Sequence, residues 1–515
     1  MSGSRARRTL VPVALAAWLS VAGGVAAWPA LGHTVGESFQ LPVPLNLYLI
    51  GAATAVGASF VVTAVVARST HDRPRYPTIV VPGGASWLVS VALQVLGMAW
   101  WYGAIAVAVF IGGISPLPET LFWIGIWVAL PITAVLVGNP WPSLSPFRTT
   151  HALLERLLGL RGDRRLDLGL RYPPQLTRWP AVLLLLAALY AELVLPGASQ
   201  AATVGVLMIG YTLVTLAGML AFGRLAWLRN AEFFELELGW LGRIGPIGRR
   251  VVNDSVCAGC EEACDPSRCV DCPECAVVAE AGERRVELRP WIAGLAEVRR
   301  AGWSDVAFII LLLSGVTYDG IQETGLWASV ASALLTPLFG IFGPNLAFTV
   351  LGLAGLVGIF ALFLLAFALA MGMTRLLRGP GSSVALAPNA GVYASTLLPI
   401  AAGYLIAHYG TLVIAGILRL PALIANPLLN VFPDLTWIPS AAVWYLSVGA
   451  IVTGHIAAIV LAHRIALRDV PHRPTLAGLP LVALMIGYTV LSLWIIAQPI
   501  VIDPGITPVA YAPHR

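Results

Sequence analysis

Residues 345–371 read NLAFTVLGLAGLVGIFALFLLAFALAM, a continuous apolar run without a charged side chain. A helix needs about 20 such residues to cross the hydrocarbon core of a bilayer, so this run predicts a transmembrane helix. A strand of a membrane barrel would instead alternate apolar and polar residues over about ten positions. The stretch therefore favours an α-helical membrane protein.

Similar apolar runs recur along the whole chain. Of its 515 residues, 58% are hydrophobic and only 11% are charged, and the mean hydropathy is +0.82. We therefore predict an all-α fold, a polytopic transmembrane helix bundle of about eleven spans with the lipid bilayer as its partner. The predicted spans are 10–28, 45–67, 87–111, 117–138, 180–198, 202–223, 303–320, 345–371, 391–416, 440–463 and 477–499.

The arginines predict how the bundle is oriented. All basic residues are arginine, and most of them gather in segments that fall on one side if the spans simply alternate. The positive-inside rule makes that side cytoplasmic, in a multi-pass protein of the cell membrane. The net charge of +5 belongs to these loops, so it gives no indication of a nucleic-acid partner.

This orientation divides the chain into parts. We expect a signal peptide or signal anchor at 1–32, a first bundle half at 33–228, a cytoplasmic Cys-rich loop at 229–302, a second bundle half at 303–499 and an extracytoplasmic tail at 500–515. Within the first half, the cytoplasmic segment 139–179 spaces its leucines as an amphipathic, interfacial helix does. Neither cytoplasmic segment carries a phosphate-binding glycine loop, so the sequence does not support ATP-driven transport.

The cysteines predict a metal site. All six lie within nineteen residues, at Cys257, Cys260, Cys264, Cys269, Cys272 and Cys275. Two-residue gaps let neighbouring thiolates grip one ion, and such spacing is typical of zinc and of iron–sulfur sites. Local disulfides are the alternative, but the reducing cytoplasm predicted for this loop favours a metal.

The other end of the chain offers a candidate copper ligand. The segment Ala30-Leu31-Gly32 resembles the cleavage site of a signal peptide. Cleavage there would make His33 the N-terminal residue, whose amine and ring nitrogen together can bind copper. The alternative is an uncleaved anchor followed by a juxtamembrane histidine.

Few ionisable residues lie inside the predicted spans, and such residues are functional candidates because they are costly in hydrocarbon. Asp319 and His408 fall at similar depth toward the outer face, at about 1.5 Å of rise per residue, and His455 lies deeper. Asp319 and His408 could hold a metal, with His33 at similar height, or pass a proton; the alternative is a structural pair between two helices. For Glu192 we expect a structural hydrogen bond. For His463, at the cytoplasmic interface, we expect snorkelling.

Several short stretches together carry a resemblance that covers nearly the whole chain. They are His33–Gly36 with Leu41–Pro44, Gly138–Trp141, Val286–Pro290, Gly315–Gly320, Ala407–Tyr409, Gly454-His455 with Ala462–Arg464, and Met485–Thr489. The chain resembles a family of actinobacterial and haloarchaeal polytopic membrane proteins commonly labelled fenitrothion hydrolase or left uncharacterised. The resemblance implies an organophosphate-hydrolase activity. This chain departs from the family's pattern in its longer cytoplasmic loop with six cysteines.

Three functions remain open from the sequence. A membrane hydrolase would use a metal at the outward-facing site, with Asp319, His408 and His455 as catalytic candidates acting on a small molecule. A transporter or channel for a metal ion or small solute would line its path with the same residues. A membrane-anchored redox or assembly protein would use the cysteine loop.

Overall fold

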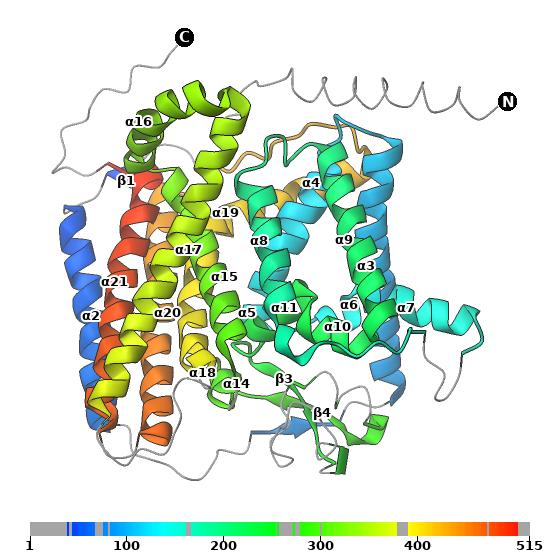
Figure 1. Ribbon diagram of the computed structural model, residues 1–515, viewed down its shortest axis with the longest axis horizontal. Helices are drawn as coiled ribbons and strands as arrows, with labels where there is room; N and C mark the ends of the chain where they lie inside the picture. The colour runs from blue at the N-terminus through cyan, green and yellow to red at the C-terminus, as the bar shows by residue number, and fades with distance from the viewer. Residues whose placement is uncertain are drawn as a thin grey trace.

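The computed structural model describes residues 39–40, 44–66, 76–80, 83–160, 166–253, 255–256, 271–272, 275, 279–298, 301–378, 390–470 and 473–502. These residues form the predicted all-α bundle, whose helices run up and down through the molecule (Figure 1). Among them, ten helices are long and apolar enough to cross a membrane. The protein is therefore a multi-pass membrane protein.

Nine predicted spans correspond to such helices. They are α2 (Leu45–Val66), α3 (Gly83–Phe110), the continuous unit α4 (Leu117–Glu119), η1 (Thr120–Ala129) and α5 (Leu130–Leu136), α9 (Ala201–Phe222), α15 (Trp303–Gln322), α17 (Pro344–Leu377), the unit α18 (Ala390–Ala394), η5 (Ser395–Leu397) and α19 (Leu398–Ala425), α20 (Ser440–Asp469) and α21 (Pro474–Ile500). The shorter helices are α6 (Trp141–Leu144), α7 (Pro146–Leu157), η2 (Pro174–Leu176), α10 (Arg224–Asn230), α11 (Phe233–Gly242), η4 (Ala281–Glu283) and α14 (Ala293–Ala296). The predicted span 10–28 lies outside the described residues.

Two of our span predictions need correction. The span predicted at 180–198 is the shorter helix α8 (Trp179–Leu193), which ends early because Pro196 and Gly197, the latter with φ +73°, cannot continue it. In addition, helix α16 (Gly325–Phe342) was not predicted; it is apolar but buries none of its residues. Figure 1 shows α16 at the upper end of the bundle, where the chain turns from α15 into α17.

Two small sheets lie at opposite ends of the bundle. At the upper end in Figure 1, β1 (Phe39–Gln40) pairs in parallel with β5 (Val501–Ile502). At the lower end, β2 (Thr78–Ile79), β4 (Arg284–Leu288) and β3 (Ile247–Val251) form an antiparallel sheet in that order. The cysteine segment is thus the connection between β3 and β4.

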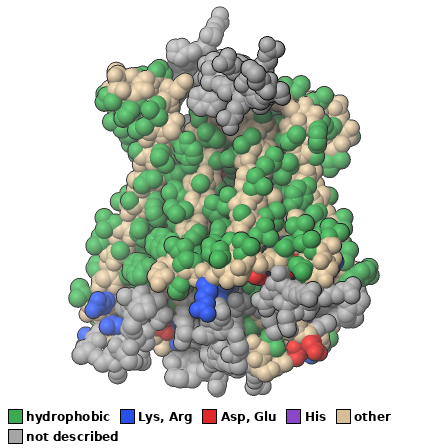
Figure 2. Space-filling view, turned by 45° about the vertical axis from the view of Figure 1, so that its right-hand side comes forward, with side chains coloured by type: hydrophobic (Ala, Val, Ile, Leu, Met, Phe, Trp, Pro, Cys, Tyr) green, Lys and Arg blue, Asp and Glu red, His purple; other side chains and the backbone are tan. Residues whose placement is uncertain are grey.

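Charge separates the two ends as the alternation of spans predicts. Figure 2 shows hydrophobic side chains over the middle of the visible face and charged side chains along its lower edge. Apart from Arg419, the described arginines gather toward the lower side of Figure 1, for example on α7 and α10, at the end of α20 and in the three-stranded sheet. We call this side of the bundle the arginine-rich end. The opposite end is the arginine-poor end. The compartment that each end faces stays a prediction.

Close helix contacts hold the second half of the bundle together. A Cβ atom at Gly454 of α20 would lie 2.3 Å from the backbone oxygen of Pro399, and one at Gly403 of α19 would lie 2.5 Å from that of Ala450. Only glycine allows two helix backbones to approach this closely. The crossing fixes α19, which carries His408, against α20.

Candidate functional site

Asp319 of α15 and His408 of α19 form a hydrogen-bonded pair in the upper half of the bundle. The Nε2 atom of His408 lies 2.9 Å from Oδ2 of Asp319, and the hydroxyl of Tyr409 donates to the same oxygen at 2.5 Å. The side chain of His408 is 4% exposed and that of Asp319 is 23% exposed. The structure therefore brings together the two residues that we expected at matched depth.

Neighbouring residues fix the orientation of this pair. The ring of Tyr404, one helical turn before His408, stacks on the imidazole with centroids 5.5 Å apart and an angle of 23°. A Cβ atom at Gly320 would lie 2.0 Å from the Tyr404 hydroxyl, so glycine is needed next to Asp319 for α15 to approach α19. Glu323, which caps α15, lies within electrostatic range of both Asp319 and His408.

Glu192, near the end of α8, continues the site toward the other bundle half. It lies within electrostatic range of Asp319 on one side and of Glu237 on the other, and it hydrogen-bonds with Trp127. Trp127 belongs to η1, a π-helical stretch of ten residues. Such wide turns are rare inside helices and are frequent at functional sites. The hydrogen bond that we expected for Glu192 is therefore present, whereas its proximity to two other acidic groups was not expected.

Glu237 and Glu232 continue the acidic residues toward the arginine-rich end. Glu237, on α11, is buried, and its Oε2 atom has no hydrogen-bond partner. Glu232 caps the same helix by accepting bonds from the backbone nitrogens of Phe234 at 3.2 Å and Glu235 at 2.7 Å. Its carboxylate also accepts from Trp141 at 3.0 Å. We call Asp319, Glu192, Glu237 and Glu232 the carboxyl file.

An aromatic cluster encloses the inner part of the carboxyl file. Its members come from several helices and include Trp101, Trp127, Trp141, Phe147, Tyr211, Phe233 and Phe234. The hydroxyl of Tyr211 donates directly to Glu232. Next to this cluster, Glu235 forms a two-pronged bond to Arg148, with its oxygens 3.2 Å from Nε and 2.7 Å from Nη2. The file thus ends against a cation at the arginine-rich end.

Burial makes the inner carboxyls readily protonated. Glu232 and Glu237 lie outside the ten candidate spans. Burial raises the pKa of Glu237 from 4.5 to about 8, with the Glu232 charge as a second cause. Burial likewise raises the pKa of Glu232 to about 7, although the bonds from Tyr211 and Trp141 oppose the shift. Both groups can therefore gain and lose protons near neutral pH.

The other predicted site residues do not join this pair in the part of the chain that the structure describes. His455 of α20 is fully buried, and its Nδ1 atom lies 2.8 Å from the backbone oxygen of Ile451. His33, Cys257, Cys260, Cys264 and Cys269 lie outside the described residues. Cys272 and Cys275 are buried and pack with Val251 and Ala279 beside the sheet. Across the described ranges, no group of three metal-ligating side chains occurs.

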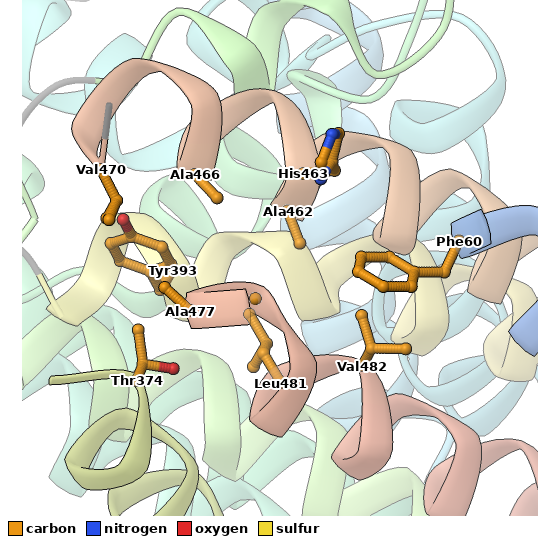
Figure 3. Close-up of a pocket in the computed structure, with 11 residues that line it drawn as sticks. Phe60, Thr374, Tyr393, Ala462, His463, Ala466, Val470, Ala477, Leu481 and Val482 are labelled. Carbon is orange, nitrogen blue, oxygen red and sulfur yellow. The ribbon is translucent and has the colours of Figure 1, made fainter. Parts of the chain in front are cut away.

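His463 differs from our expectation of snorkelling. It is 2% exposed and lines a narrow pocket between α2, α17, α18, α20 and α21 (Figure 3). Neither of its ring nitrogens has a hydrogen-bond partner, and neither do the hydroxyls of Thr374 and Tyr393 in the same pocket. Its Nδ1 and Nε2 therefore do not reach the water interface.

Sequence reasoning missed the three glutamates of the segment Glu232–Glu237. That segment reads EFFELE, with apolar residues between the acidic ones. The alternation of acidic and apolar residues in this segment could have indicated their burial, because carboxylates next to Phe and Leu are unusual in a solvated loop.

Comparisons of the chain with family models, with curated proteins and with solved structures found no match.

Proposed function

We propose that the chain is a proton-coupled membrane transport protein and that the carboxyl file carries the proton. One observation supports this most directly: acidic side chains follow one another from the upper half of the bundle to its arginine-rich end. Buried ionisable residues are costly whether or not they lie within a membrane span, and rows of them are characteristic of proton relays in pumps and transporters. The proposal extends the transporter hypothesis drawn from the sequence by naming the proton as the coupling ion.

The outer station of the proposed path is the Asp319 cluster. A proton that arrives there binds an oxygen of the Asp319 carboxylate, which exchanges its hydrogen bonds with His408 and Tyr409. Each transfer breaks one O–H or N–H bond and forms another on the next acceptor, so the charge moves with the proton. His408 can carry the proton on its ring while Asp319 stays ionised.

The inner half of the path runs from Glu192 through Glu237 to Glu232. Electrostatic proximity links Glu192 to Glu237, and no direct hydrogen bond joins them among the described residues, so the proposed path uses water for this step. The unpartnered Oε2 atom of Glu237 supplies a position at which such a water could bind. From Glu232, the proton passes to the Glu235–Arg148 pair and the loops beyond.

The proposal can be tested in proteoliposomes with a pH-sensitive dye inside and a potassium diffusion potential across the membrane. We expect wild-type protein to increase proton flux above that of protein-free vesicles. Asp319→Asn should reduce this increment at least tenfold, because the amide cannot ionise. The matched control is Asp434→Asn, because this carboxylate lies in an exposed turn and, among the described residues, accepts hydrogen bonds from Thr436 alone. Equal flux in Asp319→Asn and wild type would contradict the proposal.

The hydrolase function implied by the resemblance is the second candidate, and the Asp319–His408 bond favours it. An aspartate that orients a histidine is an arrangement suited to general-base catalysis, or to holding the histidine ring in place as a metal ligand. The residues available for such a metal are Asp319 and His408, with His33 outside the described residues. Hydrolysis of fenitrothion by the purified protein, lost in His408→Gln, would support this function over proton transport.

A further inference from the structure

Arg419 stands apart from every other described arginine. It lies on α19, six residues before that helix ends, and so belongs to the arginine-poor end, where the described residues include no second arginine. The residue is only 6% exposed. A cation at this end runs against the charge distribution of the rest of the chain, so a specific interaction should explain it.

The hydrogen-bonding atoms of Arg419 point to a missing partner. Its Nε and Nη2 atoms are both buried, and neither has a hydrogen-bond partner in the structure. These two atoms form one edge of the guanidinium, and their parallel N–H bonds match the two oxygens of a carboxylate or phosphoryl group. A buried guanidinium whose donor edge stays empty is strongly unfavourable, whereas a bound oxyanion satisfies both donors and the charge.

The described surroundings of Arg419 include a carboxylate that does not pair with its donor edge. Glu119 of α4 lies within electrostatic range of Arg419, yet no ion pair joins the two described side chains. A nearby carboxylate of this kind holds the arginine in place and weakens anion binding, so that binding becomes reversible. Gly416, one turn before Arg419, packs against Ile124, where a Cβ atom would lie 2.6 Å from Cγ2.

Arg419 also shares a helix face with the proton site. It follows His408 by eleven residues, which is about three turns or about 16 Å along α19. Residues at this spacing lie above one another on the same side of a helix. An anion held at Arg419 would therefore sit outward of the Asp319–His408 pair, on the side from which a substrate enters from the arginine-poor end.

We infer that Arg419 binds an oxyanion, a carboxylate or a phosphoryl group, at the arginine-poor end of the bundle. The inference rests on the proposed transport function only in naming this anion as a candidate substrate. Binding itself depends on the guanidinium edge alone. A free anion and the headgroup of an anionic lipid share the required chemistry.

Calorimetric titration of the full chain in phosphatidylcholine nanodiscs tests the inference, with inorganic phosphate and benzoate as separate probes. We expect saturable binding of at least one probe. Arg419→Lys should weaken it at least tenfold, because lysine keeps the charge and loses the two-pronged edge. Glu119→Gln should tighten it severalfold. The control Arg375→Lys, at the arginine-rich end, should leave it unchanged, and melting temperatures verify that each variant is folded.

The outcomes separate this inference from the proposed function. If neither probe binds saturably, or if Arg419→Lys binds as wild type does, Arg419 is a structural residue and the inference is wrong. If phosphatidylglycerol in the nanodisc abolishes probe binding to wild type, the site is confirmed and its ligand is a lipid headgroup. Proton flux in Asp319→Asn is measured without either probe, so its loss tests the proposed function separately from binding at Arg419.

Discussion

Two carboxyl groups of the file, Glu237 and Asp319, lie in different environments. Glu237 is buried with one oxygen unpartnered, which costs free energy unless the group is protonated or meets water. Asp319 instead accepts two hydrogen bonds from α19. The file therefore joins a hydrogen-bonded outer carboxyl to an inner one whose pKa is raised by burial to about 8.

The raised pKa of Glu237 predicts how stability depends on pH. Below about pH 4.5 the group is neutral in the folded and unfolded chains, and its burial costs little. As the pH rises toward about 8, only the unfolded chain is ionised, so this group's contribution to stability is progressively lost. Glu237→Gln removes this titration.

We therefore expect the melting temperature of Glu237→Gln, relative to wild type, to be higher at about pH 8.5 than at about pH 5. The difference should correspond to at most a few kcal/mol. Thermal unfolding in detergent at both pH values measures it. A relative melting temperature that is the same at both pH values would show that Glu237 has an ordinary pKa.

Helices and their contacts set the geometry at the scale of elements. α19 holds His408 opposite Asp319 because glycines let it cross α20 closely, and η1 turns Trp127 toward Glu192.

Gly454→Ala should therefore lower the free energy of unfolding by about 1–3 kcal/mol, since its Cβ atom would clash with the backbone of Pro399. Gly449→Ala, on the same helix with open space around it, is the matched control. Equal melting temperatures for the two variants would contradict this account of the crossing.

The cysteine connection between β3 and β4 is the element whose chemistry is still a prediction. Six thiols broken by glycine and proline cannot build an apolar core alone, so we propose that zinc or an iron–sulfur cluster orders the loop. Substituting Cys257 and Cys260 together by serine should abolish stoichiometric metal while membrane insertion continues. Metal analysis and an absorption spectrum of the purified protein measure this. Full metal content in the double variant would exclude this pair as ligands.

The sequence predicted the helices better than the contacts between them. Nine spans follow from long apolar runs, and the Asp319–His408 contact follows from helix rise and matched depth. α16 was missed because its apolar run directly follows α15, and hydropathy alone does not separate such a run from its neighbours. Glu232 and Glu237 were missed because their burial depends on aromatic residues from several helices, which no periodicity within α11 indicates.

The whole molecule separates its charges between two ends. Chain order and Figure 1 place the sheet with the cysteine connection at one end and the β1–β5 pair, close to the C-terminal residues described, at the other. A cytoplasm-active reporter inserted near Gly282 should therefore work, and one fused after Arg515 should be silent. The reverse pattern would put the cysteines in an oxidising compartment and favour disulfides over a metal.

The proposed path through the molecule depends on Glu192, because in the described part of the chain this residue lies within electrostatic range of both Asp319 and Glu237. The most direct measurement compares proton flux through proteoliposomes that contain wild type, Glu192→Gln or Glu192→Asp. We predict that Glu192→Gln loses at least nine tenths of the protein-dependent flux and that Glu192→Asp, which keeps a carboxyl group, retains a measurable part. Wild-type flux in Glu192→Gln would contradict the carboxyl file as the route of the proton.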